Sequence, residues 1–526
     1  MRTAHTVAAV RAAEQALMAK LPDGTLMQRA AAALASVCAS LLGEVYGARV
    51  VVLAGSGDNG GDALYAAARL AGRSAEVTAI AAGAKLHEAA AAELVARGGR
   101  LTAASGDSPI GDDRAAAEGS AASGHRAAAG NQVAAAARRT IASADLIIDG
   151  LTGIGGHGGL REPAATLAAL AAAARDEGAL VVAVDLPSGI DADTGQVSGA
   201  AVHADVTVTF GTLKPGLLID PGASLAGPAE LIDIGLEEYL VEPTVISLQA
   251  ADVAAILPRP AAESDKYRRG VLGLVAGSDQ YTGAAVLSCG GAIHGGAGMV
   301  RFVSAAVAVD VVRQRWPEAV LTTYDPDRPG QAIETAGRVQ AWAVGPGIGT
   351  GPQAEALLAA ALASDVPVLV DADGLTVLAA HRDLLGRAAP VLITPHAGEL
   401  ARLLSADRAD VEARRLHYAR AAAAELGVTV LLKGSTTVIA EPDGHQPVLV
   451  NSTGTPWLAT AGSGDVLSGL AGSLLAQGVD APQAAAAAAY LHGMAGRLAA
   501  RDAPIGASDL LGAIPAAIRV VTSDNP

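Results

Sequence analysis

The chain has 526 residues, of which 51% are hydrophobic but only 2% aromatic, and 37 basic against 53 acidic side chains leave a formal net charge of −16. A chain of this length is expected to form two or more domains. The acidic balance argues against a broad surface for nucleic acid or for an anionic membrane, although backbone amides at helix N-termini can still bind a phosphate.

The N-terminal segment shows no pattern for export. No long apolar run precedes Glu14, and no stretch reaches about 20 strongly apolar residues. Cys38 and Cys289 lie far apart without metal-ligand spacing, which is typical of buried thiols in a reducing compartment. We therefore expect a cytoplasmic protein that binds neither membrane nor nucleic acid.

The first half alternates strand and helix patterns. After a helical region, a buried-strand pattern at 50–53 runs into a glycine-rich turn at 55–62. Strands at 145–149 and 180–184 end in a second glycine-rich turn and in the sequence DLPSG, and a strand at 206–210 follows. Carboxyl ends of parallel strands share one sheet edge, so these oxygen-rich turns are expected to converge.

Residues 103–144 differ from their surroundings. They contain Ala, Gly, Ser and scattered charges with almost no large apolar side chains, so we expect most of them to form a mobile insertion or a loosely held helix. The domain boundary is expected near 236–250, where the periodicity breaks. This divides the chain into domains at 1–240 and 250–526.

The second half repeats the α/β pattern with its own motifs. The predicted strands, each followed by a polar turn, are 271–276, 342–344, 367–371, 391–393, 428–432 and 437–440.

The most informative stretch lies near the end of the chain. A strand pattern at 447–450 precedes the sequences NSTG and AGSGD, and a helix pattern follows at 466–478. Amides at the start of that helix suit a phosphate, and Asp465 beside them could take a proton from a substrate hydroxyl. The pattern favours nucleotide-dependent chemistry on an alcohol; the alternative is a plain helix start with Asp465 near its cap.

The order of these motifs resembles known families. The turn at 55–62, the Asp149 turn, DLPSG at 185–189 and LMQRA at 26–30 are similar to the NAD(P)H-hydrate epimerase domain. The turns of the second half resemble the ADP-dependent NAD(P)H-hydrate dehydratases, and the fusion resembles the bifunctional NAD(P)H-hydrate repair enzymes. The implied fold is an N-terminal Rossmann-like three-layer α/β domain followed by a C-terminal ribokinase-like α/β domain.

The resemblance implies two activities on the hydrated cofactors NADHX and NADPHX. The first domain would interconvert their R and S epimers, and the second would dehydrate the S epimer with ADP, releasing NAD(P)H, AMP and phosphate. Phosphorylation turns a poor leaving group, hydroxide, into a good one.

The resemblance also implies the residues of the first site. Asp185 would be the acid/base, and potassium would be bound by Asn59, Asp149 and Ser188, which offer hard oxygen donors. The implied substrate-binding residues are Asp58, Asn59, Gly60, Gly61, Asp62, Gly153, Ile154, Gly155, Gly156, His157, Gly158, Gly159 and Asp185. This chain departs from the family's pattern in the 153–159 loop, at Asp58 and at Ala63.

In the second site Asp465 would be the catalytic base, and Gly462 to Gly464 would hold migrating negative charge. The resemblance places hydrate binding at Ala284, Gly347, His396 and Asp465. It places nucleotide binding at Lys433, Gly434, Ser435, Thr436, Thr437 and Gly464, with Mg²⁺ expected in this domain.

Other polar residues are expected to be unremarkable. Asp373 and Glu399 are interpreted as helix-cap or surface carboxylates, and solvent exposure is predicted for His87, His125, His381 and His445. Alanine-rich helices with few aromatic residues favour a homo-oligomer.

Two alternatives stay open on the sequence. The second half could be a ribokinase-like small-molecule kinase, because that fold shares the glycine-rich loop and the Asp. The first domain could be a non-catalytic module that binds a nucleotide or partner and regulates the second.

Overall fold

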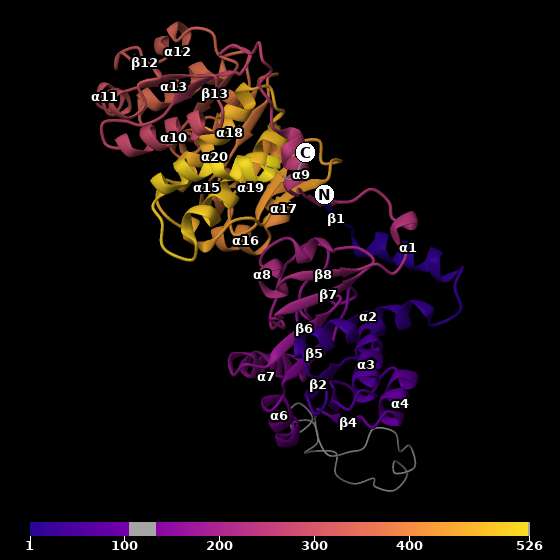
Figure 1. Ribbon diagram of the computed structural model, residues 1–526. Helices are drawn as coiled ribbons and strands as arrows, with labels where there is room; N and C mark the ends of the chain where they lie inside the picture. Colours follow the sequence, from indigo (N-terminus) through magenta and orange to yellow (C-terminus); the bar gives the residue numbers. More distant parts are fainter. Residues whose placement is uncertain (105–132, 524–526) are drawn as a thin grey trace. The chain divides into compact units, whose positions relative to one another are not determined.

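The computed structural model describes residues 1–104 and 133–523, and the chain divides into two compact units (Figure 1). The N-terminal unit is Thr3–Pro243, and the C-terminal unit is Met1–Arg2 with Thr244–Pro526.

The N-terminal unit is built on a seven-stranded sheet with the order β4-β3-β2-β5-β6-β7-β8, in which every neighbouring pair is parallel. Its strands are β2 (Arg49–Ala54), β3 (Glu76–Ala81), β4 (Arg100–Ala103), β5 (Leu146–Gly150), β6 (Leu180–Val184), β7 (Val206–Phe210) and β8 (Ala229–Ile232). The order reverses between β2 and β5. Ligands bind at such switch points in open parallel sheets, because the loops after the two strands diverge there.

Helices cover both faces of this sheet, as parallel sheets require. They are α1 (Val7–Met18), α2 (Thr25–Leu42), α3 (Asp58–Ala71), α4 (Glu88–Ala96), α6 (Ala135–Ala142), α7 (Ala164–Asp176), α8 (Gly222–Ala226) and the short 3₁₀ turns η1 (Pro215–Leu217) and η2 (Glu237–Tyr239). Successive side chains of a strand point to opposite faces, so Val50 and Val52 enter one core cluster and Val51 and Leu53 the other.

Helix α2 is long and apolar enough to cross a membrane by length and composition alone. In the structure it is a core helix, because Ala30, Ala31, Leu34 and Cys38 are buried in the same cluster as strand β2.

The C-terminal unit is built on an eleven-stranded mixed sheet with the order β1-β9-β18-β17-β16-β15-β14-β13-β10-β11-β12. Only the β16–β17 and β17–β18 pairs are described as antiparallel. The strands are β1 (Arg2–Ala4), β9 (Val245–Ser247), β10 (Val271–Val275), β11 (Met299–Ser304), β12 (Val320–Thr323), β13 (Ala341–Val344), β14 (Val368–Val370), β15 (Val391–Ile393), β16 (Thr429–Leu432), β17 (Thr437–Ala440) and β18 (Val448–Asn451).

Helices also cover this sheet. They are α9 (Ala250–Ile256), α10 (Thr282–His294), α11 (Ala306–Arg315), α12 (Gln331–Thr335), α13 (Pro352–Leu362), α14 (Asp373–Ala380), α15 (Ala397–Leu404), α16 (Arg408–Ala413), α17 (Arg415–Leu426), α18 (Ser463–Ala476), α19 (Ala481–Ala500), α20 (Ala507–Ser523) and the 3₁₀ turns η3 (Arg382–Leu385) and η4 (Pro456–Leu458). The apolar faces of α9, α10, α11, α18, α19 and α20 join one large core cluster.

Helices α10 and α18 touch through their backbones. A Cβ on Gly469 would lie 2.0 Å from the Ser288 carbonyl oxygen, and a Cβ on Gly291 would lie 2.3 Å from the Val466 carbonyl oxygen. Only glycine permits this approach, so the spacing between the two helices is set by main-chain contact.

The α/β class expected for both halves is confirmed. The sequence patterns missed several strands, among them β3, β4, β8, β11 and β12. The interpretation of 103–144 as non-core is wrong for its described end, because Val133, Ala137 and Ile141 are buried in a core cluster. Residues 105–132 of that segment lie outside the described part of the chain.

Candidate active sites

Residues of the first site gather at the carboxyl edge of the N-terminal sheet, where β2, β5 and β6 end. The turn after β2 is packed tightly: a Cβ on Gly55 would lie 1.9 Å from the Leu151 carbonyl oxygen, and a Cβ on Gly60 would lie 2.2 Å from the carbonyl oxygen of Gly55. Glycine at these two positions lets the 55–62 turn meet the loop that follows β5.

Asp185 follows β6 in a left-handed conformation, with φ of +65°. Its Oδ1 atom accepts hydrogen bonds from Thr209 Oγ1 at 3.0 Å and from the Phe210 amide at 3.2 Å, and Lys214 forms an ion pair with the same oxygen. The Lys214 side chain is only 1% exposed, so its charge is directed at this carboxylate. The two hydrogen-bond donors and the ammonium hold the Asp185 carboxyl group in one orientation.

The three expected potassium ligands share one hydrogen-bond network. Ser188 Oγ lies 2.7 Å from Asp149 Oδ1 and 3.1 Å from the Thr152 carbonyl oxygen, and Asn59 Nδ2 donates to that same carbonyl at 3.1 Å. Asp149 is fully buried, which raises its pKa to about 6 against the opposing hydrogen bonds from Ser188. These convergent hard oxygens fit a monovalent cation such as K⁺.

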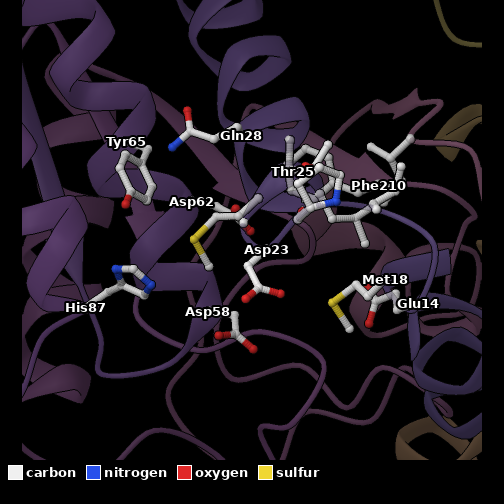
Figure 2. A pocket seen from close by; sticks show the side chains of 17 residues that line it. Glu14, Met18, Asp23, Thr25, Gln28, Asp58, Asp62, Tyr65, His87 and Phe210 are labelled. Carbon is white, nitrogen blue, oxygen red and sulfur yellow. Dashed lines mark hydrogen bonds between the residues drawn. The ribbon is translucent and has the colours of Figure 1, made fainter. Parts of the chain in front are cut away.

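The substrate loop at 58–62 borders a cavity of about 350 Å³. Figure 2 shows acidic side chains among those that line it, and Tyr65 and His87 meet edge to face at 5.7 Å between ring centroids. The cavity's acidic lining residues are Glu14, Asp23, Asp58 and Asp62.

Two of these carboxyl groups are perturbed. Burial, followed by the charges of Asp185 and Asp58, raises the pKa of Asp62 well above its ordinary value. Burial, followed by Asp185, also raises the pKa of Glu14. Neither group is favoured as a carboxylate in this environment.

The second glycine-rich loop, 153–159, begins beside the hydrogen-bond network of Asn59, Asp149 and Ser188. A Cβ on Gly153 would lie 2.9 Å from Asn59 Oδ1, and one on Gly155 would lie 2.9 Å from Arg11 Nη2. At its other end His157 Nδ1 lies 3.2 Å from Asp191 Oδ2, beside a smaller cavity of about 90 Å³.

The second site lies at the N-terminus of α18. Gly462 precedes the helix in a left-handed conformation, with φ of +90°, and Asp465 occupies the first turn. Burial, followed by the charge of Asp371, raises the pKa of Asp465 to about 7, although Lys433 acts in the opposite direction. A base with a pKa near neutrality suits general base catalysis.

Lys433 connects Asp465 with the ends of two strands. Its Nζ lies 2.7 Å from Asp371 Oδ1 and 3.8 Å from Glu399 Oε2, and a Cβ on Gly464 would lie 3.5 Å from it. Burial opposes the charge of Lys433, but Asp371 and Glu399 outweigh burial and raise the pKa of the amine. A fixed cation thus stands beside the helix amides that suit a phosphate.

The expected nucleotide loop, 433–437, is held from behind by Arg415 of α17. This guanidinium is 6% exposed and donates from Nη2 to the carbonyls of Leu432, Lys433 and Thr436, at 3.3, 2.8 and 3.0 Å. Gly434 and Ser435 are exposed at the tip of the loop, whereas Thr436 and Thr437 are buried.

The glycine turn before Asp465 is also supported from below. His492 of α19 has its Nε2 atom 2.9 Å from the Ser463 carbonyl oxygen, which can only accept, so Nε2 is the donor. Burial lowers the pKa of His492 to about 4, so the imidazole is neutral at ordinary pH.

The expected hydrate-binding residues fall into two groups. Gly347 and Ala284 are adjacent, because a Cβ on Gly347 would lie 2.8 Å from that of Ala284. His396 stands apart as the N-cap of α15, where its Nδ1 accepts from the amides of Gly398 and Glu399 at 3.0 and 3.3 Å. Its side chain is 58% exposed, and its Nε2 atom lies 3.6 Å from Glu399 Oε1.

Sequence reasoning missed several members of these sites. Glu399 does cap α15, but its side chain is only 11% exposed and lies beside Lys433, so its interpretation as a surface group is wrong. His87 and His381 are half-buried, whereas solvent exposure was predicted for both, and His87 lines the cavity of about 350 Å³. His445 is exposed as expected, and His125 lies outside the described residues. Asp371 and Lys214 stand in segments that the sequence patterns marked, but neither was assigned to a site. The residues that carried no local signal are Glu14, Arg415 and His492.

Comparison with known proteins matches both halves. Residues 272–516 match the family described as NAD(P)H-hydrate dehydratase, and residues 23–216 match the family described as YjeF-related protein N-terminus. The bifunctional NAD(P)H-hydrate repair enzyme Nnr of Mycobacterium leprae is 45% identical over 509 residues, which cover 95% of this chain and 95% of its own length. Its counterpart from Mycobacterium tuberculosis is 46% identical over 493 residues, covering 92% of each chain.

A similar solved structure is the ADP/ATP-dependent NAD(P)H-hydrate dehydratase from Bacillus subtilis, co-crystallised with ATP/Mg²⁺. It is 30% identical, covers 52% of this chain and 97% of its own, and has a TM-score of 0.47.

Proposed function

The chain belongs to the bifunctional NAD(P)H-hydrate repair enzymes, which combine NAD(P)HX epimerase and nucleotide-dependent NAD(P)HX dehydratase activities, and from this premise we propose how its residues divide the chemistry. The N-terminal unit epimerises the hydrate at the Asp185 site. The C-terminal unit dehydrates the S epimer at the Asp465 site with ADP as the phosphoryl donor.

Dehydration begins when Asp465 removes the proton of the hydroxyl on carbon 6 of the hydrated nicotinamide ring. The hydroxyl oxygen attacks the terminal phosphorus of ADP, the bond to the bridging oxygen breaks, and AMP leaves. The ring nitrogen's electron pair then expels phosphate, and loss of a proton from carbon 5 gives NAD(P)H. The single observation that carries this assignment is the half-buried Asp465, with a pKa of about 7, at a helix N-terminus beside Lys433.

The surroundings of Asp465 divide the binding task. The amides of Gly462 to Gly464 and the Lys433 ammonium would hold the migrating phosphoryl group. The exposed Gly434 and Ser435 would contact the nucleotide with Thr436 and Thr437 behind them, and Ala284, Gly347 and His396 would contact the hydrate.

Mg²⁺ would reach this site with the nucleotide. Among the described residues no group of three or more His, Cys, Asp or Glu side chains could hold a metal ion. Magnesium usually keeps several waters and binds through one or two carboxylates plus substrate phosphates, which does not require such a cage.

In the first site Asp185 would act as the acid/base, and the 58–62 and 153–159 loops would hold the substrate. Asn59, Asp149 and Ser188 would hold K⁺, which supplies a fixed positive charge without redox or acid–base chemistry of its own. The buried free thiols Cys38 and Cys289 support a cytoplasmic location. The homo-oligomer stays a prediction.

One assay tests the two assignments together. Purified protein receives a mixture of the two hydrate epimers with ADP, or with ATP, and the absorbance of regenerated NAD(P)H is followed. Complete conversion with ADP supports both activities, and conversion of about half the substrate contradicts the epimerase. A stable phosphorylated product formed from ATP, with no hydrate consumed, would instead favour a small-molecule kinase.

A further inference from the structure

Asp62 is a half-buried residue that lines the cavity of about 350 Å³ in the N-terminal unit. It lies on α3, one turn after Asp58, and its Oδ1 atom is buried without a hydrogen-bond partner in the described part of the chain. Figure 2 places its side chain among those around the cavity, between Tyr65 and Asp23 in this view. A buried carboxyl oxygen without a partner is costly, so a native structure retains one where a ligand or a reaction uses it.

Asp185 offers the opposite environment close by. Its Oδ1 atom receives three donors, from Thr209, Phe210 and Lys214, whereas its Oδ2 atom has no described partner. The Lys214 side chain is 1% exposed, and its ammonium forms an ion pair with this carboxyl group. Phe210, whose amide donates to Asp185 Oδ1 at 3.2 Å, lines the same cavity as Asp62, so the two carboxyl groups border one site. The charge of Asp185 disfavours a charge on Asp62.

We propose that Asp62 is the general acid of hydrate epimerisation and that it acts in concert with Asp185 as the general base. The inference rests on the proposed function of the N-terminal unit and adds a role that substrate binding alone does not give. Neighbouring carboxyl groups whose surroundings favour opposite protonation states are the usual means of placing an acid and a base in one site.

The step balances without any further reactant. Asp185 takes the proton of the carbon 6 hydroxyl, the bond between carbon 6 and the ring nitrogen breaks, and the nitrogen takes the proton of Asp62. The products are an open-chain aldehyde and an enamine nitrogen that carries hydrogen. Rotation about the bond between carbons 5 and 6 presents the other face of the aldehyde. Reclosure then returns both protons and gives the opposite epimer.

Charged groups on the neighbouring elements affect the pKa of Asp62. Asp58 lies on the same helix, Glu14 on α1 and Asp185 after β6, and all three raise the pKa of Asp62 after the larger effect of burial. The cations nearby serve other groups: Lys214 pairs with Asp185, and Arg11 acts on Glu14. His87 is engaged as the N-cap of α4, through its Nδ1 atom. The environment therefore holds a proton on Asp62.

The test uses the full-length Asp62→Asn variant with mixed hydrate epimers and saturating ADP. We expect NAD(P)H to appear at the wild-type rate until the S epimer is consumed, and then at a rate roughly 10²- to 10⁴-fold below that of wild type, because the amide cannot donate the proton. The first phase reports an intact second site in the same molecule. Asp176→Asn, which alters an exposed carboxylate at the end of α7, is the matched control and should behave as wild type.

The pH dependence supplies a readout that does not depend on the variant's folding. Wild-type epimerisation should decline at alkaline pH, as Asp62 loses its proton, and Asp62→Asn should lack that decline in its residual rate. A wild-type profile without an alkaline decline would overturn the role of Asp62, and so would an Asp62→Asn variant with an unimpaired second phase. A wild-type protein that stops at half conversion would instead overturn the epimerase assignment and, with it, the inference.

Discussion

The ammonium of Lys433 lies 2.7 Å from Asp371 Oδ1, and Ser468 donates a 2.5 Å hydrogen bond to the other oxygen of that carboxylate. This contact joins the end of β16 to the end of β14 and, through Ser468, to the helix that carries Asp465. A lysine that would otherwise be flexible is thereby fixed beside the proposed base, where its charge lowers the pKa of Asp465 against burial.

Replacing the base should abolish most of the dehydratase activity. We expect Asp465→Asn to lower the dehydration rate of the S epimer by roughly 10²- to 10⁴-fold, because a positioned base contributes that much. NAD(P)H absorbance with ADP measures the rate, and Asp327→Asn, on an exposed side chain of the same unit, serves as control. Near-normal dehydration by Asp465→Asn would refute the mechanism.

Asp465→Asn should also change the stability of the protein in a pH-dependent way. The folded-state pKa of Asp465 is raised from 3.8 to about 7, so the stability contributed by its bound proton is present below about pH 4 and lost as the pH rises to about 7. Asp465→Asn should therefore melt at a higher temperature than wild type at pH 8 but not at pH 4. An inactive variant with this profile is folded.

Removing the cation should shift the pH–rate profile of dehydration. The rate should fall as the pH drops through about 7, because Asp465 must be ionised to accept a proton. In Lys433→Gln the opposing charge is lost, so the acidic decline should move to higher pH, in addition to weaker nucleotide binding. Lys85→Gln, on an exposed lysine of the other unit, should leave the profile unchanged. An unmoved decline in Lys433→Gln would show that Lys433 acts on the nucleotide alone.

Arg415 should act as a positioning residue for the nucleotide loop. Arg415→Lys leaves carbonyls of residues 432–436 without donors, at a cost of roughly 1–3 kcal/mol for each group left unsatisfied. We expect a raised KM for ADP with a smaller change in kcat, together with a lower melting temperature. Arg408→Lys, on an exposed arginine of α16, should alter neither. A melting shift with an unchanged KM would make the role of Arg415 purely structural.

Lys214 should matter to epimerisation only. Lys214→Met leaves the Asp185 carboxyl group without its cation and without one of its three donors, and removing one partner of a buried pair destabilises by roughly 3–5 kcal/mol. Mixed epimers should then show a normal first phase and a strongly slowed second phase. Equal loss of both phases would point to general unfolding, which circular dichroism would detect.

Potassium should be required by the first site and not by the second. Replacing K⁺ with choline should slow the second phase of the mixed-epimer assay and leave S-epimer dehydration unchanged. Ser188→Ala removes one oxygen donor and should raise the K⁺ concentration for half-maximal epimerisation. Ser523→Ala, at the end of α20, is the control. Epimerisation at full rate in choline would exclude this cation.

The features that sequence reasoning located share one property: they are local. Asp149 and Asp185 each follow a run of buried apolar residues, and Asp465 stands in a glycine-rich turn before an apolar helix, so the pattern around each residue can be recognised locally. Strands such as β3, whose EVTAIA sequence mixes Glu, Thr and Ala with two large apolar residues, gave no such contrast. The positions of these strands are evident only in the folded sheet.

The residues that sequence reasoning missed act across long distances in the chain. Lys214 meets Asp185 across 29 residues, and Lys433 meets Asp371 across 62. The Ser463 carbonyl needs His492 from the following helix. None of these partners has a distinctive neighbourhood in the sequence, because its partner is supplied by the parallel topology of the sheet. Asp62 was found as a member of the substrate loop, but its buried, unpartnered oxygen is a property of the folded cavity.

The backbone contact between α10 and α18 makes two glycines part of the active-site geometry. Gly291 meets the Val466 carbonyl and, further along both helices, a Cβ on Gly295 would lie 2.3 Å from Ser473 Oγ, so the helices run side by side in the same direction. The first turns of α10 and α18 carry Ala284 and Asp465. The contact between the helices therefore keeps both turns at the same end of the pair and fixes their relative position along the helix axes. Side-chain repacking cannot alter that relative position, because the touching atoms are peptide groups. The distance between the turn that carries Ala284 and the proposed base Asp465 is thus set by main-chain contacts. These contacts lie several residues away from the groups proposed to perform the chemistry.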